Sequence, residues 1–267
     1  MPRPPAKPSA SAKGDAPPRR PRPFLRVVSA LLLLPACWSL TATLFLLLRP
    51  ASPPGAGAPR LTWEMVALPG GFLLWLVVYL VLPLSARSYI WAHELSHAIW
   101  ALVQGVKVGK IRVRDDGGYV TLSRTNALIG LAPYFFPLYA ILAILAWWIL
   151  HFFVDLSPWR PLWLFVVGAA WGHHVTYTLA SLAIRQQDIL ENGRLFSYTA
   201  IYLLNLLGVC IWVVATTPAT FCEFGAIFLG QTLDAYLWTG DALAAIVRWT
   251  ITVARKAIGT MPSPRKA

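Results

Sequence analysis

The segment 89–100 carries three ionisable side chains, His93, Glu94 and His97, within an otherwise apolar run. On an α-helix, residues four apart lie one turn apart on the same face, so the two histidines would stand about 6 Å from each other. Two imidazoles at this spacing can bind one metal ion. Glu94 could reach a water molecule on that ion without being a ligand, which is the His-Glu-x-x-His arrangement of zinc hydrolases.

The apolar surroundings of the motif decide between two interpretations. On the surface helix of a soluble protein, two histidines and a glutamate would be solvated side chains without a further role. Placing the same side chains beside lipid is costly unless they pair or bind a metal ion. We therefore predict a metal site that includes His93 and His97, with Glu94 as its catalytic base.

A catalytic zinc site needs a third protein ligand and an open position for water. We predict Asp188 as that ligand, because it follows a later apolar segment and would lie at the same membrane depth as the motif. The alternative for Asp188 is an ordinary loop aspartate near Arg185 or Arg194.

Three further polar residues in apolar segments are candidates for the site. His173 and His174 compete for the position of third ligand, but neighbouring helical residues point about 100° apart, so at most one can face the metal. They can instead act beside the ligands, line a substrate channel or pack in the interior. Asn205 can assist the reaction or only form a hydrogen bond between helices.

The composition is typical of an integral membrane protein, with 57% hydrophobic and 13% charged residues. The net charge of +12 is spread over the tail and the loops instead of one dense surface, so we expect a lipid bilayer and no nucleic acid as partner. Cys37, Cys210 and Cys222 are far apart, which predicts neither a disulfide framework nor a cysteine zinc site.

Four parts follow from composition along the chain. Residues 1–23 are basic and rich in proline, and we predict a disordered cytosolic tail. Residues 24–61 form a first span and loop, although Ala56-Gly57-Ala58 leaves a cleaved signal as an alternative. Residues 62–215 form the membrane core with the motif, and residues 216–267 a C-terminal helix with a short basic tail.

We predict an all-α polytopic membrane protein with about six transmembrane helices. The expected spans cover about 27–48, 63–84, 127–154, 162–184, 195–215 and 221–253. Pro133 and Pro137 predict a bend in the third span, near the site. The motif helix runs from 88 to about 103, either as a continuation of the second span beyond Pro83 or as a separate re-entrant helix.

The last of these segments is ambiguous because it contains charges. Asp234, Asp241, Arg248 and Arg255 recur at seven-residue intervals and form one polar stripe on a helix. The segment is either a span with its stripe turned inward, which we favour, or an amphipathic helix at the membrane surface.

Residues 105–124 have strand character. Lys110, Arg112 and Arg114 alternate with apolar residues, and Asp115-Asp116-Gly117-Gly118 is a turn signal. We predict a small β-hairpin on the cytosolic side. It is either a charged loop that happens to pair or a strand edge that receives substrate in extended form.

The distribution of basic residues predicts the orientation. With six spans and a cytosolic N-terminus, every Lys and Arg except Arg49, Arg60 and Arg160 falls on the cytosolic side. We therefore expect a multi-pass protein of a cell (inner) membrane with its N-terminus in the cytosol. This orientation brings the motif and Asp188 to the same side.

The sequence His93-Glu94-Leu95-Ser96-His97, the Gly-Gly hairpin and a later span that ends in an aspartate resemble the site-2 protease family of intramembrane zinc metalloproteases. The resemblance covers about residues 63–205. It implies one Zn²⁺ ion per chain on His93, His97 and Asp188, with Glu94 activating water. The family usually has its aspartate in an Asn-Pro…Asp-Gly motif, which Gln187-Asp188-Ile189 does not match, and this departure points to a divergent branch. The chain has no insertion long enough for the PDZ domain of some members, so we expect no substrate gating by such a domain.

The resemblance implies a zinc metalloendopeptidase that hydrolyses a peptide bond of a membrane-protein or peptide substrate within or near the membrane. One alternative is a catalytically inactive membrane scaffold that keeps the fold. The presence of Glu94 argues against it, since this residue is not needed to hold a metal. A metal transporter is less consistent with the sequence, because such groups are not repeated through several spans.

Overall fold

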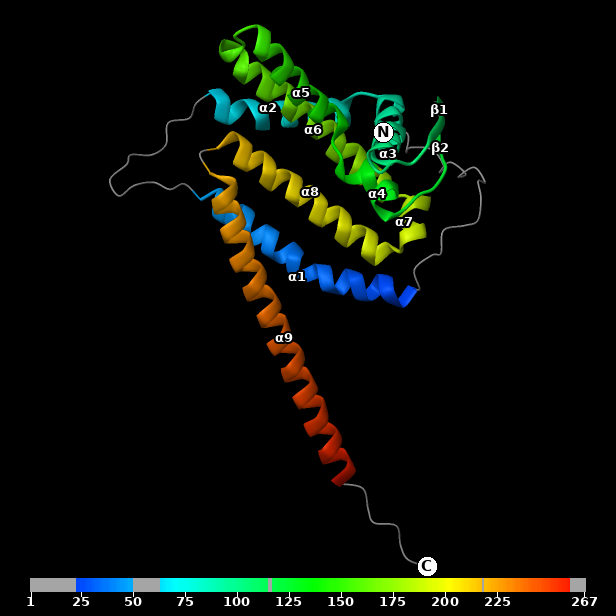
Figure 1. Ribbon diagram of the computed structural model, residues 1–267, viewed down its shortest axis with the longest axis vertical. Helices are drawn as coiled ribbons and strands as arrows, with labels where there is room; N and C mark the ends of the chain where they lie inside the picture. The colour runs from blue at the N-terminus through cyan, green and yellow to red at the C-terminus, as the bar shows by residue number, and fades with distance from the viewer. Residues whose placement is uncertain (1–22, 50–62, 115–116, 218, 260–267) are drawn as a thin grey trace, which may run out of the picture. The chain divides into compact units, whose positions relative to one another are not determined.

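A computed structural model describes residues 23–49, 63–114, 117–217 and 219–259 (Figure 1). The helices are α1 (Pro23–Leu47), α2 (Trp63–Val81), α3 (Arg87–Val103), α4 (Ala127–Phe135), α5 (Leu138–Phe153), α6 (Arg160–Leu182), α7 (Gln187–Asn192), α8 (Arg194–Thr216) and α9 (Phe221–Gly259), with a short 3-10 helix at Ser157–Trp159. The strands are β1 (Val108–Arg114) and β2 (Gly117–Leu122). The predicted disordered tail, the loop that contains Ala56-Gly57-Ala58 and most of the basic C-terminal tail lie outside the described residues.

The chain divides into two compact units. The first contains residues 1–30 and 51–205, and the second contains residues 31–50 and 206–267. All residues of the predicted metal site belong to the first unit, and α9 belongs to the second.

The predicted mostly helical fold with a small hairpin is confirmed, but six spans are not shown. α1 and residues Arg194–Ala215 of α8 are long and apolar enough to cross a membrane, and α4 with α5 adds a third if the pair is one span. Among the described residues, α2 contributes only a shorter apolar helix, Val66–Val81, and α6 and α9 are not candidates. The physical reason is composition, since α6 contains two histidines and several hydroxyl side chains and α9 carries its four regularly spaced charges.

The expected bend in the third apolar segment is present. α4 and α5 meet at an angle of 74° across the break at Phe136-Pro137. Pro137 has no backbone N–H to continue the helical ladder, so the chain turns there and α5 begins a new direction.

Two glycines let α2 and α6 pack backbone against backbone. A Cβ atom at Gly71 would lie 1.9 Å from the carbonyl oxygen of Phe165, and one at Gly168 would lie 2.0 Å from that of Leu68. No larger side chain fits at either position without a shift of the backbone. This contact fixes α6 against the helix that precedes α3.

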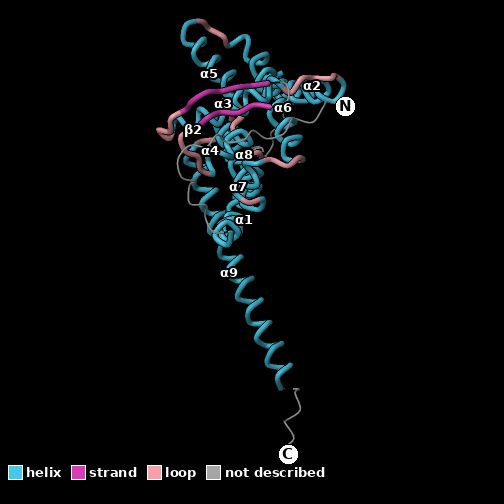
Figure 2. Tube along the Cα trace, turned by 90° about the vertical axis from the view of Figure 1, so that its right-hand side faces the viewer, coloured by secondary structure: helices cyan, strands magenta, loops and turns pink. Residues whose placement is uncertain are grey.

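The hairpin forms as predicted and lies along α3 (Figure 2). β1 and β2 are antiparallel, with Ile111 opposite Val120 and Arg112 opposite Tyr119. Along β1 the basic side chains are exposed while Ile111 and Val113 are half-buried, which is the expected alternation. The turn residues 115–116 lie outside the described residues.

Candidate metal centre

The motif helix α3 presents both histidines on one face. The rings of His93 and His97 lie with their centroids 4.9 Å apart, in an edge-to-face arrangement. Tyr89, Ile90, Ala98 and Ala101 are buried on the same helix, so packing against the rest of the unit holds it in place. The one-turn spacing that the sequence predicted is therefore realised inside the protein.

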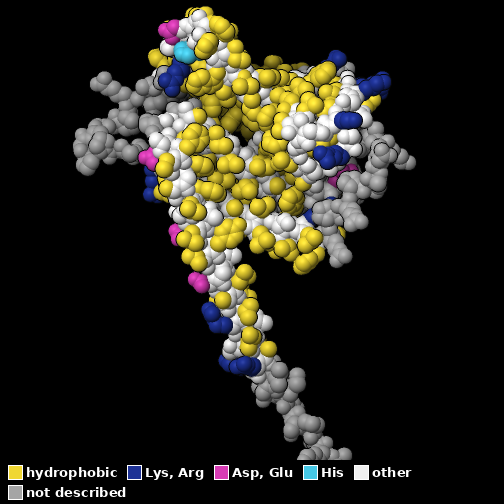
Figure 3. Space-filling model, viewed as in Figure 1, with side chains coloured by type: hydrophobic (Ala, Val, Ile, Leu, Met, Phe, Trp, Pro, Cys, Tyr) yellow, Lys and Arg dark blue, Asp and Glu magenta, His cyan; other side chains and the backbone are white. Residues whose placement is uncertain are grey.

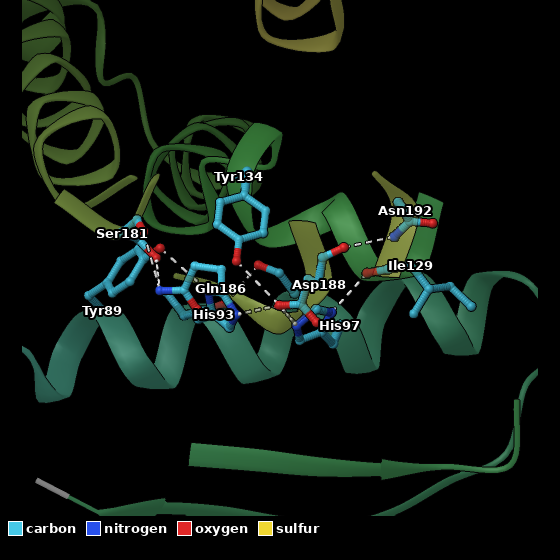
Figure 4. Close-up of polar contacts among 11 residues, drawn as sticks. Tyr89, His93, His97, Ile129, Tyr134, Ser181, Gln186, Asp188 and Asn192 are labelled. Carbon is cyan, nitrogen blue, oxygen red and sulfur yellow. Dashed lines mark hydrogen bonds and ion pairs between the residues drawn. The ribbon is translucent and has the colours of Figure 1, made fainter. Parts of the chain in front are cut away.

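Asp188 reaches the histidines because α7 packs against α4. Ile189 belongs to a buried cluster with Leu131, Ala132 and Tyr134 of α4, and this contact fixes the short helix. The side chain of Asn192 donates a hydrogen bond of 2.9 Å to the backbone carbonyl of Asp188. The carboxylate is thereby directed towards α3 (Figure 4).

The three predicted ligands converge on one point. Oδ2 of Asp188 lies 3.6 Å from Nε2 of His93 and 3.7 Å from Nε2 of His97. Burial favours the protonated form of this carboxyl, but the two neighbouring imidazoles outweigh it and hold the pKa of Asp188 below its usual range. The carboxyl of Asp188 therefore gives up its proton more readily than that of an isolated aspartate, and Figure 4 shows its contacts with the two rings.

The geometry of these three side chains fits a metal ion. One ligand atom from each residue can be chosen so that all lie within 4.8 Å of one another. A tetrahedral zinc ion with bonds of about 2.0–2.2 Å separates its ligand atoms by roughly 3.3–3.6 Å, close to the two distances from Asp188. Two imidazoles and one carboxylate also leave a fourth position for water.

A backbone carbonyl fixes the tautomer of one ligand. Nδ1 of His97 lies 2.8 Å from the carbonyl oxygen of Ile129. A carbonyl oxygen only accepts hydrogen bonds, so Nδ1 carries a proton, and Nε2 is the ring atom that could bind a metal ion when the imidazole is neutral. Metal-binding histidines are commonly held in this way.

Tyr134 is a site residue that the sequence analysis did not identify. Its hydroxyl donates a hydrogen bond of 3.2 Å to Oδ2 of Asp188, and its side chain is fully buried. The ring also packs edge-on against His93, with centroids 5.4 Å apart. Its position beside Pro133 was the only available signal, since the bend there was expected near the site.

Glu94 faces the hairpin and is buried beneath β2. A Cβ atom at Gly118 would lie 2.7 Å from Cγ and 2.9 Å from Oε1 of Glu94, so only glycine leaves room there. The Val120 backbone N–H donates a hydrogen bond to the Glu94 carboxyl, yet burial raises the pKa of this group to about 7. The Glu94 carboxyl therefore lies on the same helix as the two histidines and keeps its proton to a higher pH than an exposed glutamate.

The two other candidate histidines, His173 and His174, lie outside the metal group but line a neighbouring pocket that also includes His93, Ser96 and Tyr139. Nε2 of His173 lies 3.0 Å from the Ser88 hydroxyl, whereas Nε2 of His174 is buried without a hydrogen-bond partner among the described residues. Neither belongs to the group of described side chains that could hold a metal ion, whose third member is Asp188.

Asn205 links two helices. Its Nδ2 donates hydrogen bonds of 2.8 Å to the carbonyl oxygen of Tyr134 and 2.9 Å to that of Ile201. The residue thus supports the segment that carries Tyr134, and it agrees with the second of the two roles expected for it.

Comparisons of the chain with models of protein families, with curated proteins and with solved structures gave no match.

Proposed function

We propose that this protein is an intramembrane zinc metalloprotease that hydrolyses a peptide bond of a membrane-protein or peptide substrate within or near the bilayer. The observation that supports it is the convergence of His93, His97 and Asp188, with the carboxylate of Glu94 on the adjacent helical position. A purely structural ion pair would need only one histidine and would not need Glu94.

The roles of the protein groups follow from their positions. A zinc ion held by His93, His97 and Asp188 would acidify its bound water and polarise the scissile carbonyl. Glu94 accepts the proton of the attacking water and passes it to the leaving amine. Tyr134 keeps the Asp188 carboxylate oriented, and the Ile129 carbonyl does the same for the His97 ring.

The hairpin would control access to the base. Because β2 covers Glu94, a substrate must lie beside this strand or displace it to bring a peptide bond to the site. An extended peptide that pairs with the strand edge would satisfy its backbone groups away from water.

For the membrane arrangement we propose spans at α1, α2, α4 with α5, α6 and α8, with a cytosolic N-terminus in a cell (inner) membrane. The loops that then face the cytosol contain the basic hairpin, whereas Arg49, Arg60, Arg160 and the basic residues of α9 lie on the other side. The charges of α9 are more compatible with the membrane surface than with the sixth span expected from the sequence.

The test combines metal analysis with cleavage by purified, detergent-solubilised protein. Wild type and the variants His93→Ala, Asp188→Ala and Glu94→Gln are analysed for zinc and incubated with a library of synthetic peptides that correspond to membrane spans and their flanks, with products identified by mass spectrometry. We expect near-stoichiometric zinc in wild type and Glu94→Gln and its loss in the other two. Cleavage should fall about 10²–10⁴-fold in Glu94→Gln, which is the usual contribution of a general base.

Two results would contradict the proposal. Wild-type protein without zinc would remove the metal centre and make the scaffold the leading function. Bound zinc with equal cleavage by wild type and Glu94→Gln would show that the peptidase activity belongs to a contaminant.

A further inference from the structure

The long helix α9 carries an ordered set of charges on one edge. Asp234, Asp241, Arg248 and Arg255 follow one another at seven-residue intervals, and all four side chains are exposed. The acidic pair precedes the basic pair along the helix, whose second half Figure 3 shows with acidic side chains followed by basic ones. The two acidic and the two basic positions are symmetric about a point between Ala244 and Ala245, where the charges change from negative to positive.

An apolar seam runs beside these charges. It consists of positions one and four of the same heptad, namely Leu237, Gly240, Ala244, Val247, Ile251 and Ala254. All six are exposed, and a Cβ atom at Gly240 would meet nothing within 4 Å. The contacts of α9 with α1 are made by other residues, such as Gln231 and Tyr236.

Along this seam the residues run large, small, small, large, large, small, an order that suits an antiparallel partner of the same sequence. In an antiparallel pair of helices, position one of a heptad packs against position four of the partner. Aligning the two copies about a point between Ala245 and Ile246, one residue from the point where the charges reverse, places Leu237 opposite Ala254, Gly240 opposite Ile251 and Ala244 opposite Val247. Every layer then joins one large and one small side chain, which fills the space evenly.

The same alignment pairs every charge. Asp234 then lies beside Arg255 of the partner and Asp241 beside Arg248, each pair offset by about 3 Å along the helix axis, because antiparallel helices bring equivalent flanking positions together. A parallel alignment instead places Leu237 on Leu237 and Gly240 on Gly240, which leaves some layers crowded and others empty. It also brings no opposite charges together.

We propose that α9 is a homodimerisation helix, which binds α9 of a second copy of this chain as an antiparallel pair. Two copies inserted in one membrane with the same orientation are related by an axis along the membrane normal. An antiparallel pair of helices about that axis lies parallel to the membrane plane. This agrees with the finding that α9 is not among the candidate spans of the described residues.

Disulfide trapping of the full-length protein in native membranes tests the register. In a Cys222→Ser background, the double variant Leu237→Cys/Ala254→Cys is treated with a mild oxidant. We expect a covalent dimer, because each new thiol faces the other one on the partner. The two positions are about 25 Å apart on one straight helix, so they cannot join within one chain.

Single variants separate the alternatives. Leu237→Cys alone should stay monomeric, and so should Ile246→Cys, which lies on the exposed face away from the seam. Dimers of Leu237→Cys alone would show a parallel pair and overturn the proposal. Failure of the double variant to form dimers would also overturn it and leave lipid or another protein as the cover of the seam.

A charge exchange provides an independent test by the mass of the purified protein in detergent. Asp241→Arg should weaken dimerisation about tenfold, since two attractive pairs become repulsive. The exchange Asp241→Arg/Arg248→Asp should restore it, because both pairs form again with reversed sign. Equal dimerisation of all three proteins, or no rescue by the exchange, would contradict the antiparallel register.

Discussion

At the scale of single residues, the candidate centre depends on groups that hold the ligands as much as on the ligands. The carbonyl of Ile129 orients His97, the hydroxyl of Tyr134 holds Asp188, and β2 holds Glu94 from the opposite side of α3. Such supporting contacts determine whether a ligand atom points at the metal or away from it.

The contact between Gly118 and Glu94 predicts a selective loss of catalysis. In Gly118→Ala the new methyl group would overlap Cγ of Glu94 and Cγ2 of Ile90, so the carboxylate must move. We expect zinc content to be retained and cleavage to fall about 10²-fold, the cost of a misplacement near 1 Å. Peptide cleavage and metal analysis measure both.

The matched control is Gly109→Ala on the other strand. Its new methyl would meet only Thr121, with the nearest atom 3.2 Å away, and would not approach Glu94. If both glycine variants lost activity equally, the hairpin as a whole would be responsible and not the contact with the base.

Removal of the Tyr134 hydroxyl should weaken metal binding. Tyr134→Phe keeps the buried ring but leaves Oδ2 of Asp188 without this donor. We expect zinc affinity to fall about 10-fold, at the lower end for a group that supports a ligand. A competition titration with a chelator of known affinity measures the change, and an unchanged affinity would show that the hydroxyl does not position the carboxylate.

Residue-level features differed in how far the sequence could predict them. His93 and His97 follow from local helical spacing, and Asp188 from its depth after an apolar segment. Tyr134 and Gly118 were not predicted as site residues, because their roles depend on which helix and strand pack against α3. The sequence left His173 and His174 open as ligands, and it is the packing of α7 that brings Asp188, and not these histidines, into the group that could hold a metal ion.

At the scale of elements, the close approach of α2 and α6 leaves no room for a side chain at its two contact glycines. Both helices present a glycine to a carbonyl oxygen of the other, at distances that exclude even one methyl group. The bend between α4 and α5 was predictable from Pro137, since proline changes the backbone locally. The glycine contact was not, because nothing in the sequence indicates which two helices meet.

Enlarging either glycine should therefore destabilise the first unit. Gly168→Ala is expected to lower the midpoint of thermal unfolding in detergent by roughly 3–10 °C, since overpacking costs about 1–3 kcal/mol. Gly208→Ala in α8 is the control, because a Cβ atom there meets nothing within 4 Å and alanine favours a helix. A smaller loss in Gly168→Ala than in the control would show that α2 and α6 pack differently.

At the scale of the whole molecule, composition predicted a membrane protein, and the candidate spans agree with it. The number of spans was less predictable because it depends on polar residues within apolar helices. In α6 these residues lie inside the first unit, where His173, His174 and Ser181 are buried. In α9 the charged side chains are exposed. This helix is therefore assigned to the membrane surface, although it is as long as a membrane span.

The proposed topology predicts which cysteines a membrane-impermeant maleimide reaches in intact cells that express the protein. Cys222 should be labelled, because it follows α8 and its side chain is exposed, whereas Cys37 and Cys210 are buried. In a Cys222→Ser background, Asp155→Cys and Val253→Cys should be labelled and Arg124→Cys should not. Disruption of the membrane should make Arg124→Cys reactive.

Labelling of Arg124→Cys in intact cells would reverse the proposed orientation. Protection of Val253→Cys, with labelling of Cys222 in the parent chain, would indicate that α9 crosses the membrane after all. The measurement thus tests the orientation and the place of α9 separately.

The contact of Gly71 and Gly168 also has an evolutionary consequence. Each glycine accommodates the backbone of the other helix, so a larger residue at one position would separate the helices and remove the constraint on its counterpart. Among descendants of a common ancestor, the two positions should therefore change together, long before the metal ligands do. Paired substitution at these sites would be the trace of a lineage in which α2 and α6 have moved apart.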